Sequence, residues 1–232
     1  MGKKISICQP HFIPWQGYFE IIKNCDEFII LDDIKRSSSS NSWQISSNLR
    51  ANHRSQEIKS FKVKLISKNK NLVINECKLS DDNSELLKKI ENVYKKTPYF
   101  ERYFESMKYA FKTKTNLFEL NLFFLNLFLE TINCKTTIIK SSEIINDKRK
   151  TKLEYILDLL KFRNCKTYLS FLGAKAYNDP ALFNKNDIEL NYPKYLIKKY
   201  DQFYKNKKIE YLPNLSVLDL LFNQGNKSKL FI

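Results

Sequence analysis

The chain has 232 residues, of which 43% are hydrophobic and 14% aromatic, a composition that provides a large core and excludes an intrinsically disordered protein. Forty basic and 25 acidic residues give a formal charge of +15, which can attract a tRNA, an anionic membrane surface or an acidic carrier protein. The lysines are dispersed and no arginine-rich run occurs, so a lysine-rich solvated surface without such a partner stays open.

The five cysteines are scattered, with no Cys-x-x-Cys pair, a pattern typical of a reducing compartment rather than of a disulfide framework or a zinc site. The two histidines, His11 and His53, lie far apart in the sequence, so we predict no histidine-based metal site and assign no metal ligands. Binding of Mg²⁺ by Asp32 and Asp33 is the alternative. Gln9 and Pro10 interrupt the apolar run near the N-terminus, which argues against a signal peptide. We therefore expect a cytoplasmic protein.

The first 33 residues predict a strand, a polar and aromatic turn, a short helix and a second strand. Residues 5–7 begin the first apolar run, and residues 28–31 form a second one that ends at Asp32 and Asp33. Open α/β sheets bind their ligands at the carboxyl ends of the strands. We therefore expect six side chains of this region to converge on one crevice: Gln9, His11, Trp15, Tyr18, Asp32 and Asp33. A solvated turn after the second strand is the alternative for the acidic pair.

Glycine is rare in this chain, which contains only four. One of them, Gly17, lies in the opening turn. We expect it to meet a need for positive φ or for close approach of another group to the backbone. An ordinary glycine at a helix start is the alternative.

The middle of the chain begins with the polar segment 35–42, which is too long for an ordinary connection. We predict a mobile loop near 35–56, either as a lid over the site or as a surface excursion. Alternating apolar residues predict a half-exposed strand over 61–65, with 72–74 as its pairing partner.

A helical segment is predicted near 84–133, interrupted at Pro98. Its most apolar part, residues 117–132, is shorter than the roughly 20 residues that a bilayer requires, and its polar positions share one narrow stripe. We therefore predict a buried helix and no transmembrane segment. Asn121 faces the apolar side and is expected to have a hydrogen-bond partner.

Alternation of strands and helices then resumes. We predict a strand over 136–140, a helix over 152–162, a strand over 167–171 and a terminal helix over 216–222, which Gly225 can cap. This order predicts an α/β fold with a mainly parallel, doubly wound, Rossmann-like sheet. No internal repeat or interdomain linker is visible, so a single domain over 1–232 is expected.

Several motifs together resemble the bacterial WbqC-like family. They are Gln9-Pro10-x-Phe12-x-Pro14-Trp15-x-Gly17-Tyr18-Phe19, Asp26-x-Phe28-x-x-x-Asp32-Asp33, Trp43, Thr97-Pro98-Tyr99-Phe100, Ser141-Ser142, Tyr168-Leu169-Ser170 with Gly173-Ala174 and Tyr177, and a tail from Leu215 to Gly225. The resemblance implies a protein encoded among surface-polysaccharide genes, such as those for the O-antigen of lipopolysaccharide. Some of these gene clusters make sugars that carry acyl or aminoacyl groups on nitrogen.

One departure from the family pattern follows Trp43. Where the family usually has Asn-Arg, this chain has Ile45 and Ser46, and serine does not replace the planar fork of arginine. Either Asn48 and Arg50 take over this role or an anionic contact has been lost.

The opening unit also resembles, more distantly, the HIGH-type nucleotide-binding superfamily. Gly17-Tyr18 stands in the place of its Gly-His pair, with His11 and Pro14 upstream. This resemblance implies an ATP-dependent ligase as an alternative function, although Tyr18 lacks the cation that would bind phosphate.

The candidate catalytic residues are His11, Asp32 and Asp33, because histidine and carboxylates can accept a proton near neutral pH. Aromatic side chains suit stacking on a sugar or nucleotide, and residues around Gly173 suit phosphate binding. The candidate substrate-binding residues are Gln9, Trp15, Tyr18, Trp43, Asn48, Arg50, Ser170, Lys175 and Tyr177. Packing in the core is the alternative for the aromatic residues.

These observations lead to the hypothesis of an acyl- or aminoacyl-transferase that forms an amide on a nucleotide-linked or lipid-linked amino sugar. The acyl donor is left open between acyl carrier protein, coenzyme A and aminoacyl-tRNA. Two alternatives remain: a non-catalytic protein that binds nucleotide-sugars or organises their assembly, and the ATP-dependent amide ligase.

Overall fold

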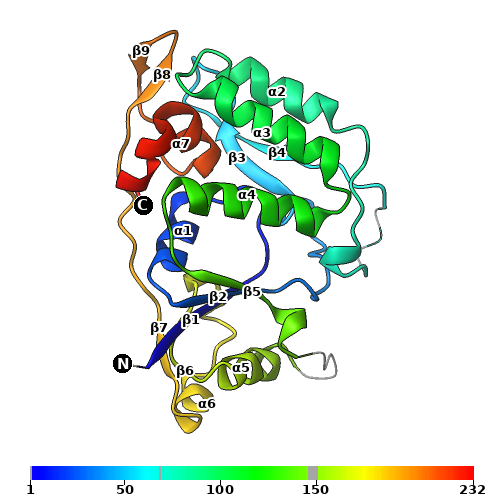
Figure 1. The fold of residues 1–232 in the computed structure, drawn as a ribbon, viewed down its shortest axis with the longest axis vertical. Helices are drawn as coiled ribbons and strands as arrows, with labels where there is room; N and C mark the ends of the chain where they lie inside the picture. Colours follow the sequence, from blue (N-terminus) through cyan, green and yellow to red (C-terminus); the bar gives the residue numbers. More distant parts are fainter. Residues whose placement is uncertain (1, 68, 70, 146–150) are drawn as a thin grey trace. The chain divides into compact units, whose positions relative to one another are not determined.

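The computed structural model describes residues 2–67, 69, 71–145 and 151–232 (Figure 1). The described residues group into two compact units. Unit 1 comprises Met1–Gln9, Glu20–Ile34 and Lys135–Leu196, and unit 2 comprises Pro10–Phe19, Lys35–Cys134 and Ile197–Ile232. Because the chain passes repeatedly from one unit to the other, no single linker marks a boundary in the sequence. The single domain expected from the sequence stays a prediction.

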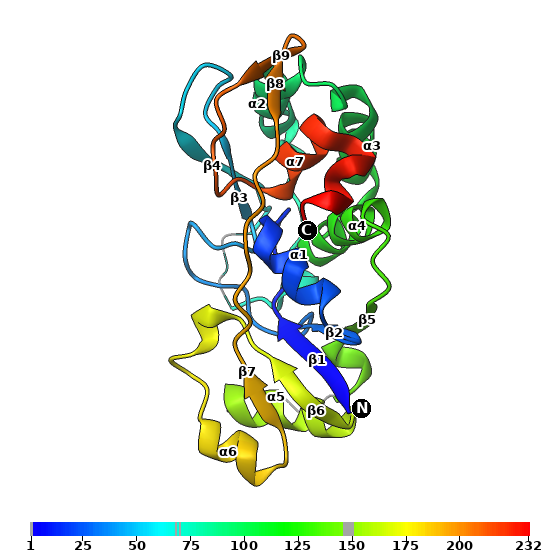
Figure 2. The same cartoon turned by 90° about the vertical axis from the view of Figure 1, so that its left-hand side faces the viewer.

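Unit 1 is built on a parallel sheet. In the described part of the chain this sheet has five strands in the order β5-β2-β1-β6-β7, and every neighbouring pair is parallel (Figure 2). The strands are β1 (Lys3–Cys8), β2 (Glu27–Ile30), β5 (Thr137–Lys140), β6 (Cys165–Leu169) and β7 (Glu189–Asn191). The predicted Rossmann-like α/β fold with a mainly parallel sheet is therefore confirmed.

Helices flank this sheet. The helix α5 (Lys152–Phe162) contacts β6, and α6 (Pro180–Lys185) contacts β7 (Figure 1). A capping box at Thr151 and Glu154 begins α5. The core between α5, α6 and the sheet contains Ile5, Ile7, Ile29, Leu159, Leu160 and Phe183. Alternate residues of β1 and β2 thus supply one apolar face, as strand periodicity requires.

Unit 2 combines helices with two hairpins (Figure 1). Its helices are α2 (Ser84–Tyr94), α3 (Phe100–Thr113), α4 (Leu117–Thr131) and α7 (Val217–Gln224). The strand β3 (Ser46–Arg50) pairs with β4 (Ile58–Lys62), and β8 (Gln202–Tyr204) pairs with β9 (Lys207–Ile209), both antiparallel. The helix α3 contacts α2, α4 and α7, and α7 also contacts β3 and β8. The helix α1 (Gln16–Lys23) begins among the residues of unit 2 and ends among those of unit 1.

The prediction of a buried helix at 117–132 is confirmed by α4, whose apolar residues pack in the core while Glu119, Asn126 and Glu130 are exposed. Asn121 has the predicted partner, because its Nδ2 donates to the carbonyl of Gln44 at 2.9 Å. No helix in the described part of the chain combines the length and apolar character that a bilayer crossing requires.

The pairing predicted for residues 72–74 is wrong. Val73 forms an isolated bridge with Lys35, and Ile74 begins a short 3₁₀ helix. The partner of β4 is instead β3, which lies inside the segment predicted as a mobile loop. The mobility of the remaining loop stays a prediction.

Candidate functional site

The turn after β1 is fixed by hydrogen bonds within unit 2. Ile13 has a φ of +44°, which is a strained conformation for a β-branched residue. Its carbonyl accepts hydrogen bonds from Ser47 Oγ at 2.8 Å and from Ser216 Oγ at 2.7 Å. The backbone N–H of Phe12 donates to the carbonyl of Trp43 at 2.7 Å. The turn is therefore held by β3, by residue 43 and by the start of α7.

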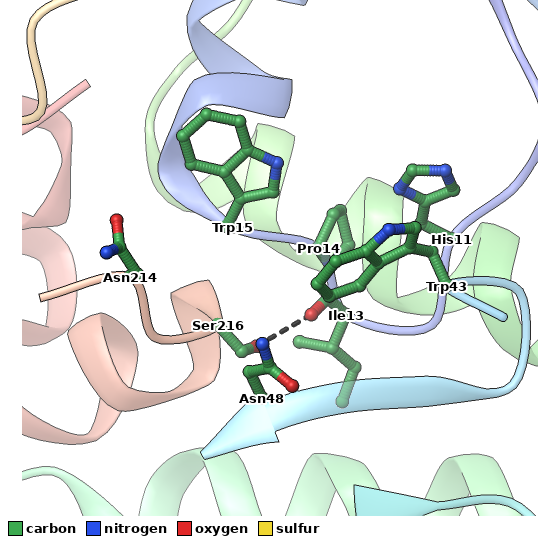
Figure 3. Close-up of a pocket in the computed structure, with 8 residues that line it drawn as sticks. All are labelled: His11, Ile13, Pro14, Trp15, Trp43, Asn48, Asn214 and Ser216. Carbon is green, nitrogen blue, oxygen red and sulfur yellow. Dashed lines mark hydrogen bonds between the residues drawn. The ribbon is translucent and has the colours of Figure 1, made fainter. Parts of the chain in front are cut away.

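These contacts surround a cavity of about 360 Å³, here called the aromatic pocket (Figure 3). It is lined by His11, Ile13, Pro14, Trp15, Trp43, Asn48, Asn214 and Ser216. Its size falls in the range of small-molecule sites, about 300–1,000 Å³. The described lining residues offer two indoles, an imidazole, two side-chain amides and a hydroxyl, and include no carboxylate, ammonium or guanidinium group.

Gly17 shapes one wall of this pocket. A Cβ atom on Gly17 would lie 2.3 Å from Cη2 of Trp15, so the glycine allows the indole to pack directly on the backbone of α1. The expectation of close approach is confirmed. The expectation of a positive φ at Gly17 is wrong. Among the described residues, the one glycine with a positive φ is Gly225, at +54°.

His11 is packed between aromatic rings. Its ring centroid lies 4.9 Å from that of Tyr18 and 6.4 Å from that of Trp43. Burial lowers the pKa of His11 to about 3, which keeps the imidazole neutral near pH 7 and makes it a weak base. Its Nδ1 atom is buried and has no hydrogen-bond partner among the described residues. A ligand that reaches Nδ1 would satisfy this atom.

Two carboxylates in unit 1 form a second group, the acidic cluster, which consists of Asp32, Asp33, Ser141, Ser142 and Tyr155. Asp32 and Asp33 follow β2, and Ser141 and Ser142 follow the neighbouring parallel strand β5. The carboxyl ends of both strands therefore meet at one edge of the sheet.

All four carboxylate oxygens of the acidic cluster accept hydrogen bonds. Asp32 Oδ1 accepts from Ser142 N at 3.0 Å, and Asp32 Oδ2 accepts from Ser142 Oγ at 2.7 Å. Asp33 Oδ1 accepts from Ser141 Oγ at 2.6 Å, and Asp33 Oδ2 accepts from the Tyr155 hydroxyl at 2.6 Å. Burial, together with the hydrogen bond to Asp33, raises the pKa of Tyr155 above its ordinary value, so the phenol stays a donor. Among the described residues, no group of three or more His, Cys, Asp or Glu side chains is arranged to hold a metal ion.

The other candidate residues occupy different environments. Gln9 directly follows β1 in unit 1 and is half-buried. Ser170 follows β6 and accepts a hydrogen bond from Asn178 Nδ2 at 3.0 Å. Lys175 and Tyr177 are exposed. Tyr18 is only 1% exposed and lies in the core of unit 2.

The structure also places the residues at which this chain departs from the family pattern. Ile45 and Ser46 are buried, and Ser46 Oγ donates to the carbonyl of Ser42 at 2.8 Å. Asn48 lines the aromatic pocket, whereas Arg50 lines another pocket of unit 2. The roles predicted for Asn48 and Arg50 stay predictions.

Cys8 is a poor nucleophile in this structure. Burial raises the pKa of its thiol to about 12, so the reactive thiolate is scarce at neutral pH.

Three side chains at these sites were not predicted for such a role: Asn214, Ser216 and Tyr155. Ser216 was predicted only as the first residue of the terminal helix, and its Oγ caps α7 by accepting from Leu218 N at 3.2 Å. Asn214 has a φ of +61° and follows a proline, which is a turn signal that the sequence contained. Tyr155 lies in a regular amphipathic helix and carried no local signal of its contact with Asp33.

Comparisons with known proteins agree with the sequence motifs that resemble the WbqC-like family. The model of the WbqC-like protein family matches residues 9–230. Uncharacterized protein Rv1507c of Mycobacterium tuberculosis (strain ATCC 25618 / H37Rv) is 26% identical over 230 residues, which cover 96% of this chain and 94% of that protein. Because the family match extends from the turn after β1 to the last 3₁₀ helix, this chain belongs to the WbqC-like protein family.

Proposed function

We propose that this protein binds the ring of an amino sugar in the aromatic pocket. The observation that supports this proposal is the pairing of Trp15 and Trp43 with the amides of Asn48 and Asn214 around one small cavity (Figure 3). Indoles offer flat apolar surface with an N–H at one edge, and amides both donate to and accept from hydroxyl groups. A hydroxyl-rich ring with an apolar face fits these walls.

The construction of the pocket supports tight binding. The strained backbone at Ile13 is held by two serine hydroxyls, so the loop needs little further ordering when a ligand enters. The free Nδ1 of His11 offers an unused hydrogen-bonding position. Trp43 is 44% exposed and has apolar surface that a ligand can cover.

The context of the ligand comes from the family resemblance, which implies surface-polysaccharide assembly. We propose a nucleotide-linked or lipid-linked amino sugar as the acceptor in that pathway. Acyl or aminoacyl transfer to its amino group is our second, finer candidate. Asp32 and Asp33 of unit 1, predicted from the sequence as catalytic, remain candidate acid–base groups, because ligands of parallel sheets bind at the carboxyl edge.

In the proposed reaction the sugar nitrogen attacks the carbonyl carbon of a thioester or ester donor. The new C–N bond forms as the C–S or C–O bond breaks, and the proton of the amine passes through a general base to the sulfur or oxygen leaving group. His11 is the candidate base that lines the aromatic pocket, and its lowered pKa makes it a weak one. A donor such as acyl carrier protein or aminoacyl-tRNA is polyanionic, which suits the charge of +15.

Calorimetric titration with glucosamine, galactosamine and their uridine-diphosphate-linked forms tests sugar binding. We expect Trp43→Ala to weaken binding at least tenfold, because the indole is proposed as a main contact. Tyr109→Ala is the matched control, since Tyr109 is another exposed aromatic residue of unit 2, at 57% exposure. Equal affinities for wild type and Trp43→Ala would contradict the proposal.

A further inference from the structure

A second pocket of unit 2, here called the basic pocket, has a volume of about 380 Å³. Its lining includes Arg50, His53, Arg54, Tyr204, Ile209 and Glu210. These residues come from β3, from the loop that follows it, and from the β8–β9 hairpin with the residue after it.

The two arginines of the basic pocket carry charge that is not neutralised by a direct ion pair among the described residues. Arg54 is exposed. The buried guanidinium of Arg50 donates to Gln202 Oε1 and to the carbonyls of Ser55 and Glu210. These bonds use three of its five N–H groups, and the other two have no acceptor among the described residues.

Carboxylates near the basic pocket do not cancel this charge. Glu210 lines the pocket, but its contact with Arg50 is through the backbone carbonyl. Asp219 forms no direct ion pair with Arg50 among the described residues. The two are linked through the amide of Gln202, which donates to Asp219 Oδ1 at 3.0 Å, and their charges interact at longer range. The pocket therefore keeps a positive potential that favours an anion.

His53 adds a flat surface and an open hydrogen-bonding atom. Its ring stacks on Tyr204, with centroids 3.7 Å apart and an interplanar angle of 5°. Its Nε2 is buried without a hydrogen-bond partner among the described residues. Burial lowers the pKa of His53, and the positive charges of Arg54 and Lys205 lower it further. The neighbours of His53 thus repel additional positive charge, as expected of an anion site.

The basic pocket and the aromatic pocket are bordered by the same two segments. On β3, Asn48 lines the aromatic pocket and Arg50 lines the basic pocket. Residues i and i+2 of a β-strand, such as Asn48 and Arg50, share a face and lie about 7 Å apart. The segment 204–216 likewise contributes Tyr204 and Glu210 to the basic pocket and Asn214 to the aromatic pocket. The two pockets are therefore neighbours along β3 and along residues 204–216.

We infer that the basic pocket binds the diphosphate of a carrier-linked sugar whose ring occupies the aromatic pocket. The inference rests on the proposed function for its sugar end and on Arg50, Arg54 and His53 for its phosphate end. Guanidinium groups bind phosphate oxygens with paired, charge-assisted hydrogen bonds. A diphosphate on the anomeric carbon starts one oxygen away from the ring, so neighbouring pockets are the arrangement that such a ligand needs. Nucleotide-linked and polyprenyl-linked sugars share this chemistry.

Titration with inorganic diphosphate tests the phosphate end without any sugar. We expect Arg54→Ala to weaken binding about tenfold, the effect of losing one charged contact worth about 1.4 kcal/mol. Arg102→Ala is the matched control, because Arg102 is an exposed arginine that lines a different pocket of unit 2, of about 390 Å³. An Arg102→Ala protein within twofold of wild type supports the inference. Absence of binding to wild type, or equal losses in the two variants, would overturn it.

Two further probes identify the carrier. Binding of uridine diphosphate more tightly than inorganic diphosphate would indicate a nucleotide, and tighter binding of farnesyl diphosphate would indicate a lipid. Either result supports a diphosphate site if Arg54→Ala weakens it. Failure of all three diphosphates to bind, with sugar binding still sensitive to Trp43→Ala, would overturn this inference and leave the proposed function standing.

Discussion

The aromatic pocket and the acidic cluster differ in how much hydrogen-bonding capacity they leave unused. In the acidic cluster every oxygen of Asp32 and Asp33 accepts a hydrogen bond from the protein. In the aromatic pocket the Nδ1 of His11 is buried without a partner among the described residues, and Trp43 is 44% exposed. Buried polar atoms are normally satisfied, and His11 Nδ1 is one of the exceptions, as is His53 Nε2 of the basic pocket. We propose that a ligand supplies the missing partner of His11.

This difference in hydrogen bonding predicts different effects of mutation in the two regions. A satisfied carboxylate pair is held in one geometry and contributes to the stability of unit 1. At neutral pH an imidazole whose Nδ1 has no partner gains no stability from that atom, and we propose that it bonds to a ligand instead. Mutations in the first region should therefore change stability, whereas mutations in the second should mainly change binding.

The largest effect is expected for Asp32→Asn. The amide keeps one acceptor oxygen but places an NH₂ group in the position of the other. Either the Ser142 hydroxyl or the donors at Oδ1 then lose their bond to residue 32 in a buried site. We expect a loss of about 2 kcal/mol in the free energy of unfolding, measured by urea denaturation. Asp187→Asn is the control, because Asp187 is exposed with a φ of +55°, a conformation that asparagine also adopts. If both variants were as stable as wild type, the acidic cluster would not be the tightly bonded group described here.

The next effect concerns pH and His11. In the unfolded chain the imidazole takes up a proton near pH 6.5, whereas burial holds its folded-state pKa near 3. The unfolded state therefore binds more protons between these values, and stability falls as the pH drops from about 6.5 toward 3.

Comparison with His11→Asn isolates the contribution of this one group. As the pH drops through that window, we expect the free energy of unfolding of wild type to fall relative to that of the variant. The expected slope is on the order of 1 kcal/mol per pH unit. Thermal or urea unfolding at several pH values between 7 and 4 measures it. Parallel stability curves for the two proteins would show that His11 titrates in the folded protein as it does in the unfolded one.

A smaller effect is expected for Gly17→Ala. The added Cβ would overlap the indole of Trp15, so this side chain must leave its present position in the aromatic pocket. We expect sugar affinity to fall about fivefold, close to 1 kcal/mol, with little change in melting temperature. Gly173→Ala is the matched control, because nothing lies within 4 Å of a Cβ at that position. Identical sugar affinities for both variants would remove Trp15 from the proposed contact surface.

Much of the fold could be predicted from local sequence patterns. The strands β1, β2 and β5 contain apolar runs followed by polar residues, and α4 and α5 have the apolar spacing of buried helices. The strand β7 has one apolar residue, Leu190, and was not predicted. The strand β3 could not be predicted in this way, because four of its five residues, Ser46, Ser47, Asn48 and Arg50, are polar. Its pairing with β4 and its burial come from tertiary contacts.

The candidate site could be predicted only in part, because only some of its residues lie in distinctive local patterns. His11 and Trp15 lie in one distinctive turn, and Trp43 follows a conspicuous polar loop, so these residues could be named as candidates. Asn214 and Ser216 line the same pocket from a segment about 200 residues away in the chain. Local patterns carry no information on such long-range contacts. For the same reason they could not show that Asn48 and Arg50 line different pockets.

Tryptophan fluorescence tests the central claim most directly. The chain contains two tryptophans, Trp15 and Trp43, and both line the aromatic pocket. Titration with free glucosamine or galactosamine, which do not absorb at the excitation wavelength, should change the emission along the same saturation curve that calorimetry records. In Trp43→Phe, the remaining Trp15 signal should respond at a higher sugar concentration. Calorimetric binding of a sugar with unchanged emission from both tryptophans would contradict a sugar site in the aromatic pocket.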